Sequence, residues 1–350
     1  PPYGACLLGS IDISKFVRNP FVFFGNFDWS GYKTCVQNFT RMLDNVADIS
    51  NLPLTEQQEE LRLKRRHGMG ITGFGSSCVM MGMRYGDDES KDFLDRILSD
   101  MVNHGWDAGF GLADEKGTAP ILSEKEDRVK FCQSRYFDNT LDHDLLDAIL
   151  RKGSRFTHHT SIAPTGTISL SLGNNCSSGI EPSFAHEYTR NIIRPGKKAK
   201  ESVPVYSYEA LAYRQANGDK PLPENLFHDA SDISPRDHID IQATAQRWVD
   251  SSISKTINVP TDYPFDDFKE LYRYAWEKGC KGCTTFRFNP DVTQGVLVKQ
   301  DDLKSTTYTF TLSDGSTVQA RGDEIIEYNG ESQTAANLHD AIKDGYYGRL

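Results

Sequence analysis

The chain has 350 residues, 38% of them hydrophobic, which is enough to bury one large core or two ordinary ones. Its 39 Lys and Arg residues against 49 Asp and Glu give a net charge of −10, which argues against a general nucleic-acid-binding surface. No run of about 18 apolar residues occurs, so no membrane span is expected. The seven cysteines are scattered and odd in number, which is typical of the reducing cytoplasm rather than of a disulfide framework.

The first part of the chain predicts a strand, a helix and a glycine-rich strand. Residues 5–13 alternate small, apolar and polar groups, which predicts a buried strand and turn. Apolar residues then recur at helical spacing, at Tyr32, Val36, Phe39, Leu43 and Val46. The basic run 64–67 predicts a solvated helix end, and residues 68–86 predict a strand that packs closely against its neighbours. They lack a G-x-G-x-x-G frame with an acidic residue further on, so no dinucleotide-binding fold is predicted.

The middle of the chain alternates helical and strand-like patterns. One helix has its buried face at Phe93, Leu94, Ile97, Leu98, Met101 and Val102, with acidic residues 87–89 at its start. Residues 106–138 carry little signal, and a second helix ends at residues 151–153. Residues 190–233 predict an irregular surface excursion. A helix starting at Ser234, a strand over 253–259, a further helix around 268–276 and a strand over 283–288 complete an order that predicts an α/β barrel.

The last 45 residues or so differ in texture from the rest. Residues 308–320 alternate around Asp314 and Gly315, which is a hairpin signature. Residues 334–343 then predict a short helix. We expect a small appended module here, and a docking role and a plain C-terminal cap remain equal alternatives.

Residues 161–182 read SIAPTGTISLSLGNNCSSGIEP and form the most informative stretch. A strand-like lead over 156–162 breaks at Pro164 and Gly166, and hydroxyl residues follow at positions 165, 167, 169 and 171. A strand that runs into a small, hydroxyl-rich turn offers backbone N–H groups and short donors to an oxyanion. The pattern predicts a phosphate-binding cradle, with a tight strand-to-helix turn as the alternative.

Five stretches in this order along the chain carry a family resemblance: PYGACLLGSI from residue 2, the Arg-Arg-x-Gly-x-Gly segment from residue 65, APTGTIS with SGIEP between 163 and 182, WVDSSISKTINVP from 248 and AWEKGCKGCT from 275. Together they cover roughly residues 1–290 and resemble the large catalytic subunit of ribonucleotide reductases, in the form found in the adenosylcobalamin-dependent class. The resemblance implies the C-terminal half of a ten-stranded α/β barrel over residues 1–300, with an appended hairpin and helix module over 301–350. It also implies reduction of ribonucleotides to 2′-deoxyribonucleotides by thiyl-radical chemistry.

The resemblance assigns site residues as well. Cys6 would be one half of the dithiol that reduces the substrate. The substrate phosphates would be held by Ala163, Pro164, Thr165, Gly166, Thr167, Ile168 and Ser169. Asn174 and Glu181 would shape the same site.

The partners follow from what the family has and this sequence lacks. The family's Asn-x-Cys-x-Glu radical loop, which precedes the Pro-Tyr-Gly-Ala-Cys segment, does not occur here. We therefore expect a separate N-terminal half to complete the enzyme, and no nucleotide reduction by this chain alone. Because the last residues up to Leu350 contain no cysteine, an external thiol reductant is expected. A homodimer of the assembled enzyme is compatible with the resemblance.

Two further cysteines and a strand bear on the choice of cofactor. Cys280 and Cys283 could be a zinc half-site, a redox pair or structural thiols; the last is favoured, and no metal site is predicted because no second pair of ligands is evident. Residues 284–287 lack the tyrosine pair of enzymes that import their radical, which favours adenosylcobalamin, although no residue can be named as its ligand.

Two other functions stay open. One is a non-catalytic nucleotide- or partner-binding half-barrel that keeps the cradle without the radical chemistry. The other is an unrelated phosphate-binding barrel enzyme, which would need its own acid–base pair. His158 and His159 are the candidates for that pair, but alternation along a strand would point them to opposite faces.

Overall fold

The computed structural model describes residues 2–22, 26–140, 143–193, 200–218, 220–287, 297–298, 306–311 and 315–343. Its helices are α1 (Trp29–Ile49), α2 (Thr55–Lys64), α3 (Phe74–Met81), α4 (Asp88–Lys116), α5 (Lys125–Cys132), α6 (Arg135–Thr140), α7 (His143–Lys152), α8 (Gly166–Ser171), α9 (Tyr208–Asn217), α10 (Pro235–Gln246), α11 (Phe265–Glu277) and α13 (Ala335–Lys343), with short 3-10 turns η1 (Ile13–Phe16) and η2 (Pro120–Leu122). Its strands are β1 (Leu7–Asp12), β2 (Val17–Arg18), β3 (Asn26–Phe27), β4 (His67–Thr72), β5 (Glu187–Ile193), β6 (Lys200–Tyr206), β7 (Thr256–Val259), β8 (Thr284–Arg287), β9 (Leu297–Val298), β10 (Thr307–Thr311), β11 (Thr317–Arg321), β12 (Ile325–Tyr328) and β13 (Glu331–Thr334).

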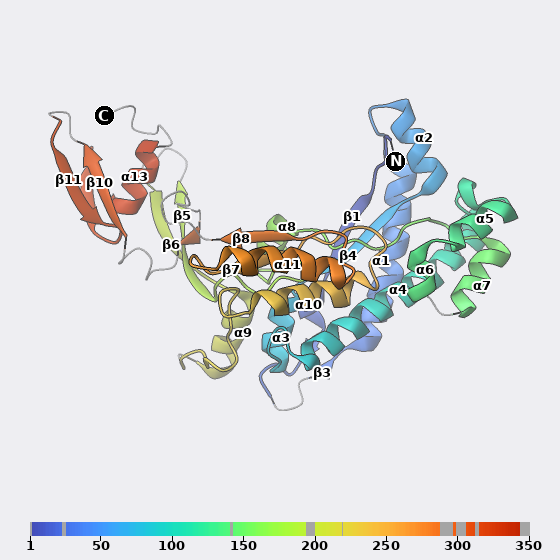
Figure 1. Ribbon diagram of the computed structural model, residues 1–350, viewed down its shortest axis with the longest axis horizontal. Helices are drawn as coiled ribbons and strands as arrows, with labels where there is room; N and C mark the ends of the chain where they lie inside the picture. The colour runs from blue at the N-terminus through green and yellow to red at the C-terminus, as the bar shows by residue number, and fades with distance from the viewer. Residues whose placement is uncertain are drawn as a thin grey trace.

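Parallel strand-like segments form the centre of the molecule (Figure 1). Strand β1 pairs with β4 in parallel, and β7 pairs with β8 in parallel. Residues 156–162 lie beside β4, where the Met69 N–H donates to the His159 carbonyl at 2.8 Å. On their other side the Ile162 N–H donates to the Ser252 carbonyl at 3.0 Å. Because these segments run the same way, the loops that follow them gather at one edge, where α/β proteins place their sites.

The core lies between these strands and the long helices. In α1 the residues Tyr32, Val36 and Leu43 are buried, and in α4 the buried face runs from Phe93 through Phe110. The Tyr32 hydroxyl donates to the Ile97 carbonyl at 3.2 Å and joins the two helices. The apolar periodicity therefore predicted both helices correctly. Over 106–138, where the sequence carries little signal, the structure continues α4 to Lys116 and buries Trp106.

A buried ion cluster fixes the start of β4. Asp44 of α1 has no exposed surface, and its carboxylate accepts hydrogen bonds from Arg65 at 2.5 Å and from Arg155 at 3.0 Å. Arg65 ends α2 with a φ of 49°, which turns its side chain inward. The predicted solvated helix end is therefore wrong for Arg65 and for His67, which is also fully buried. The burial of Arg65 is explained by its ion pair with Asp44, a buried carboxylate on a helix distant in sequence.

Other segments differ from the sequence-based expectation. Residues 156–162 form isolated parallel bridges rather than a named strand. The excursion at 190–233 contains the antiparallel pair β5 and β6, followed by α9. The α/β class is confirmed, but within the described residues the strands form small separate sheets and no closed barrel.

Strands β10 and β11 and helix α13 lie together near the C-terminus (Figure 1). Strands β10 and β11 pair in antiparallel register, with Thr307 opposite Arg321, and α13 follows the second hairpin, β12 with β13. Tyr308, Phe310 and Leu338 pack together in a cluster that contains no residue from the barrel-like part. The predicted hairpin and helix are confirmed, whereas the second hairpin was not predicted.

None of the helices in the described ranges combines the length and apolarity that crossing a membrane would need.

The ion cluster makes a first prediction. Replacing Asp44 with Ala leaves Arg65 and Arg155 buried without their carboxylate, and we expect the free energy of unfolding to fall by about 3–5 kcal/mol. The matched control is Glu115→Ala, which breaks an exposed pair with Arg41 and should cost far less. Urea denaturation of both variants measures the difference, and equal losses would show that burial is not what gives the cluster its importance.

Buried histidines make a second prediction. Burial, with the charges of Arg65 and Arg155, lowers the pKa of His67 to about 3. The folded protein therefore keeps His67 neutral while the unfolded chain binds a proton below about pH 6.5, so stability is lost as the pH falls through that range. Neither ring nitrogen of His67 has a partner among the described residues, so His67→Phe removes the titrating group without removing a hydrogen bond.

The expected result is a shallower loss of stability on acidification. Between pH 6 and pH 5 the variant should lose less unfolding free energy than the parent, approaching a difference of about 1.4 kcal/mol per pH unit. Denaturant titrations at several pH values measure both slopes. Parallel slopes would mean that His67 is protonated in the folded state.

Candidate functional site

The segment between residue 163 and α8 forms a sharply turned loop at the ends of the central strands. Thr165 has a φ of 54°, and its buried hydroxyl accepts a hydrogen bond from the Gly179 N–H at 2.7 Å. The same hydroxyl lies 2.9 Å from that of Thr72, the last residue of β4. Thr165 therefore holds together the end of a strand, the start of a helix and the second turn.

Three backbone donors at the start of α8 remain available to a ligand. Within the described residues, no group accepts a hydrogen bond from the N–H of Gly166, Thr167 or Ile168. The first N–H groups of any helix lack intrahelical acceptors, and here Gly166 and Thr167 are exposed. Since α8 has only six residues, its dipole is small, and the donors themselves are what an anion would bind.

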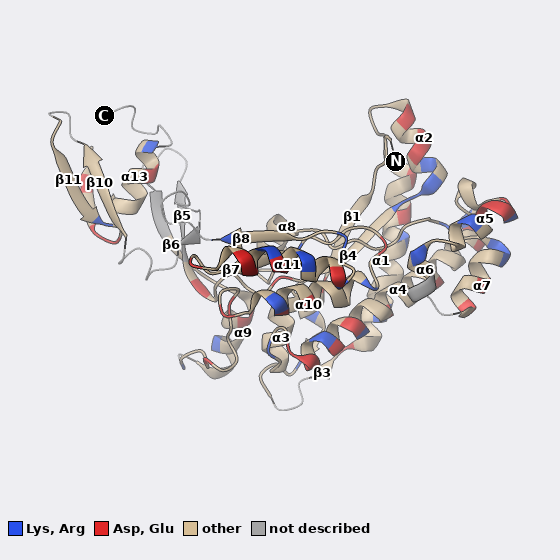
Figure 2. Ribbon diagram, viewed as in Figure 1, with Lys and Arg blue, Asp and Glu red and all other residues tan. Residues whose placement is uncertain are grey.

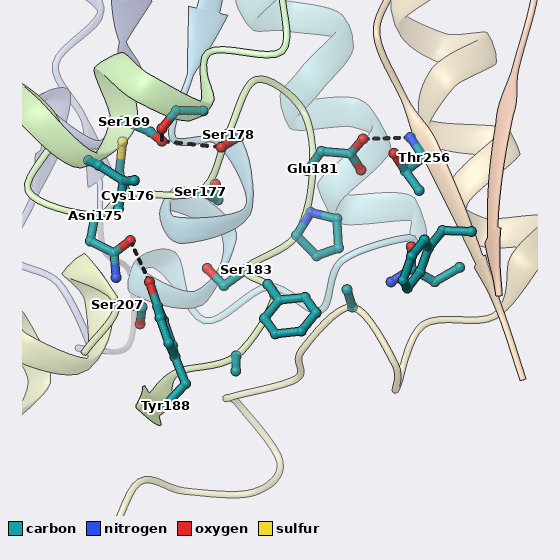
Figure 3. Close-up of a pocket in the computed structure, with 18 of the residues that line it drawn as sticks. Ser169, Asn175, Cys176, Ser177, Ser178, Glu181, Ser183, Tyr188, Ser207 and Thr256 are labelled. Carbon is teal, nitrogen blue, oxygen red and sulfur yellow. Dashed lines mark hydrogen bonds between the residues drawn. The ribbon is translucent and has the colours of Figure 1, made fainter. Parts of the chain in front are cut away.

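Ser169 stabilises the first turn of α8 through its side-chain hydroxyl. Its hydroxyl donates to the Gly166 carbonyl at 3.0 Å and lies 3.2 Å from the hydroxyl of Ser178 (Figure 3). The hydroxyls of Thr165 and Ser169 are therefore used inside the loop, and the Thr167 side chain is exposed. Of the seven residues predicted to bind phosphate, Gly166, Thr167 and Ile168 keep N–H groups that have no acceptor among the described residues.

A cavity of about 610 Å³ opens beside the loop (Figure 3). Gly166 and Ser169 line one side, residues between 175 and 185 line the bottom, and residues of β7 and β8 line the other side. Its walls combine hydroxyl groups with the aromatic side chains of Phe184, Tyr188 and Phe286. This volume and mixture are typical of a pocket for one nucleotide-sized ligand.

Glu181 joins the two sides of the pocket. One carboxylate oxygen accepts from the Thr256 N–H at 2.5 Å, and the other accepts from the Lys255 ammonium at 2.5 Å. Lys255 is almost fully buried, and its Nζ is also 2.8 Å from Nδ1 of His238. Burial lowers the pKa of Lys255, and Glu181 opposes that shift. Burial and the neighbouring Lys255 likewise lower the pKa of His238, to about 3.

Sequence reasoning did not identify Lys255 or His238. The available signal was a lysine inside the predicted strand 253–259, because a cation buried in a strand requires a carboxylate partner. Glu181, which was expected to shape the site, lines the pocket.

Cys6 lies away from this pocket. It immediately precedes β1, and its sulfur lies against the backbone of Gly68, where an added Cβ would be only 2.7 Å away. The strand registers place Cys6 level with about residue 157, six residues before the loop, which corresponds to about 20 Å along a strand. The structure thus brings the loop residues together but places Cys6 at the opposite ends of the strands.

The Cys6 thiol is held in its neutral form. Cys6 is exposed as a residue, yet the protein around its sulfur desolvates the thiol and raises its pKa to about 11; the carboxylate of Asp250 adds to that shift, and Arg66 opposes it. At neutral pH the group is a thiol rather than a thiolate, so it can give up a hydrogen atom or proton but is a poor nucleophile.

The other candidates lie outside the pocket. His159 is fully buried with its ring stacked on Phe156, whereas His158 lies partly exposed beside a different cavity. The two imidazoles therefore do not converge on one reacting atom. Cys280 and Cys283 are half-buried free thiols, and burial raises the pKa of each. Across the described ranges no three His, Cys, Asp or Glu side chains are grouped so that they could hold a metal ion.

Comparison with known proteins identifies the family. The model of the family described as "Ribonucleotide reductase, barrel domain" matches residues 2–286. A relative from Thermoplasma acidophilum, named vitamin B12-dependent ribonucleoside-diphosphate reductase, is 28% identical over an alignment of 342 positions that covers 93% of this chain and 39% of that protein. A protein of the same name from Mycobacterium tuberculosis H37Rv is 30% identical over 305 residues, covering 82% of this chain and 39% of the relative.

The match covers much of this chain and a minor part of its relatives. A vitamin B12-dependent ribonucleotide reductase from Rhodopirellula baltica shows the same pattern, with 25% identity over 86% of this chain and 33% of the relative. The chain thus spans about two fifths of the length of the first relatives or less. Because the family model matches most of the sequence, the chain belongs to the ribonucleotide reductase barrel-domain family.

Proposed function

We propose that this chain is the part of a ribonucleotide reductase catalytic subunit that binds the substrate phosphates and carries one cysteine of the reducing dithiol. The observation that carries the proposal is the set of free N–H groups at Gly166, Thr167 and Ile168, at the start of a helix whose first residue, Gly166, lines a nucleotide-sized pocket. Membership of the barrel-domain family supports it, and so do the relatives' names.

The fold supports the same proposal. Strand β1, strand β4, residues 156–162 and residues 251–254 follow one another in parallel, as expected for part of a ten-stranded barrel. We propose that residues 1–300 form the C-terminal half of that barrel and that residues 301–350 form an appended module. The remaining barrel strands would come from a region equivalent to the rest of the relatives' length, in the same polypeptide or in a second one.

Each site residue then has a definite task. The phosphates of a ribonucleoside di- or triphosphate accept hydrogen bonds from the N–H groups of 166–168, while residues 163–165 and Ser169 fix the loop that presents them. The nucleoside lies in the 610 Å³ pocket. Cys6 and a second cysteine of the completing region together supply the two electrons and two protons that replace the ribose 2′-hydroxyl with hydrogen; the hydroxyl leaves as water, and the two sulfurs end as a disulfide. That pairing requires Cα atoms about 4.4–6.8 Å apart.

The cofactor of the assembled enzyme is proposed to be adenosylcobalamin, in line with the relatives' names. When bound, it would supply the initial radical. The pocket has room for one nucleotide-sized ligand and not for a nucleotide and a corrin together, so no residue of this chain is assigned to the cofactor. An external thiol would reduce the dithiol after turnover, and the assembled enzyme would be a homodimer in the cytoplasm.

One observation favours a second candidate function. Cys6 lies about 20 Å along the strands from the phosphate loop, so the chain taken alone does not juxtapose the thiol and the phosphates. A nucleotide- or partner-binding half-barrel without catalysis would need only the loop. The two functions differ in whether Cys6 affects turnover of the completed protein.

Gly166 allows binding to be tested without harm to folding. A Cβ at this position would meet no protein atom within 4 Å, so Gly166→Ala should leave the unfolding free energy intact. The added methyl group projects into the open space before the N–H donors, so ADP binding should weaken by about tenfold or more. Gly111→Ala on α4 is the matched control, because its Cβ also meets nothing and it does not line the pocket. Calorimetric titration of ADP that finds equal affinity in both variants would exclude the loop as the phosphate site.

Turnover tests the role of Cys6. The chain is mixed with a separately expressed N-terminal region that bears the radical loop, with adenosylcobalamin and dithiothreitol, and deoxynucleotide formation is measured. We expect Cys6→Ser to abolish multiple turnover, while Cys132→Ser on α5 retains it. Nucleotide binding without turnover in the parent mixture would instead support the non-catalytic function.

A further inference from the structure

A second cavity, of about 330 Å³, lies at the opposite end of the strands from the phosphate loop and has a different chemical character. It is bounded by the end of α2, by η2, by α5 and by residues 157–158. Lys64, Arg66, Lys130 and His158 line it, and Asp127 is its one acidic residue. In a chain of net charge −10, such a concentration of basic groups is unusual. Figure 2 shows basic positions where α2 ends and on α5.

Arg66 is the unsatisfied group of this cavity. Its Nε is buried with no hydrogen-bond partner, and no carboxylate of the described residues forms an ion pair with it. The neighbouring arginines differ: Arg65 is bonded to Asp44, and Arg128 donates to the carbonyls of Leu122, Ser123 and Leu150. A buried guanidinium nitrogen without an acceptor is costly, so its presence points to an acceptor that comes from outside these residues.

The other cations leave the cavity positively charged. Lys64 is paired with Glu60, and Lys130 is 3.5 Å from Asp127 with a side chain that is 75% exposed and free to move. Burial lowers the pKa of His158 to about 4, and the charges of Arg66, Lys281 and Lys64 contribute to that shift. The imidazole is therefore neutral at pH 7, and it reports a positive potential that an anion would relieve.

The apolar walls of the cavity indicate that its ligand also has an apolar part. Ile121, Leu122 and Phe131 form an apolar side opposite the basic groups. The volume exceeds that of a bare oxyanion and is at the lower end of the range for small-molecule sites. Arginine and lysine together favour a tetrahedral oxyanion, because the guanidinium offers paired donors and the ammonium a mobile point charge.

We propose that this cavity is a binding site for a small organic phosphate, whose phosphoryl group is held by Arg66, Lys64 and Lys130 and whose apolar part packs against Ile121, Leu122 and Phe131. The site is separate from the phosphate loop and does not depend on the proposed reductase activity. Since α2 ends at the start of β4, occupancy would also brace the strand on which Gly68 contacts Cys6.

The test uses inorganic phosphate and phenyl phosphate as probes, with the imidazole proton resonances of His158 as the local reporter. Both probes should shift these resonances and raise the pKa of His158, because a bound anion stabilises the imidazolium. Phenyl phosphate should bind more tightly than inorganic phosphate, because only phenyl phosphate can fill the apolar side. If neither probe moves the His158 signals, the proposal is wrong. If the two probes bind with equal affinity, the proposed packing of an apolar group against Ile121, Leu122 and Phe131 is wrong.

Paired variants separate this site from the loop and from unfolding. Arg66→Gln should weaken phenyl phosphate binding by about tenfold. Asp127→Asn removes the competing carboxylate and should tighten it. Arg62→Gln, an equal charge change at an exposed position of α2 that does not line the cavity, is the control and should leave the affinity nearly unchanged. Gly166→Ala, which blocks the loop, should likewise have no effect on the His158 signals. If the Arg66 and Arg62 variants lose equal affinity for phenyl phosphate, the binding is general electrostatic attraction and the proposed site is wrong.

Discussion

The carboxylate of Asp44 is the point on which the central part of the molecule depends. From α1 it binds Arg65, which precedes β4, and Arg155, which precedes the strand-like residues 156–162; Lys116 at the end of α4 completes the cluster. Burial would raise the pKa of Asp44, but the hydrogen bonds and charges of these three cations outweigh burial and lower it. One buried anion therefore sets where two adjacent segments begin, and both segments lead to the pocket.

The far ends of the same segments are fixed by close backbone approach rather than by charge. A Cβ at Gly70 would be 2.2 Å from the carbonyl oxygen of Ser161, so only glycine lets β4 and its neighbour come this near. Two residues on, the hydroxyl of Thr72 meets that of Thr165. The positive φ of Thr165 is a strained conformation for a β-branched residue, and the hydrogen bonds of its hydroxyl with Thr72 and Gly179 maintain it. Because Thr165 is held in this conformation, α8 begins directly after it, and the first N–H groups of α8 are left without acceptors.

Periodicity and local turn chemistry predicted much of this fold. The helices α1, α7, α10 and α11, and the hairpin β10–β11, follow from apolar spacing and from capping or turn residues near to them in the sequence. The inward turn of Arg65, the pairing of Glu181 with Lys255 and the full length of α4 did not, because each depends on a partner distant in sequence. The turned loop over 163–169 was predicted from its residue types, but which of its donors remain free depends on the partners that Thr165 and Ser169 find in the folded protein.

The pairing of Lys255 with Glu181 has a consequence for how a nucleotide would reach its site. Glu181 is the single charged residue among those that line the larger pocket in the described part of the chain, and the buried ammonium behind it cancels that charge. An anionic ligand would thus be held by short-range amide dipoles and not drawn in by a positive field. Capture in this pocket should depend little on ionic strength, because screening acts on long-range attraction between charges that the pocket does not present.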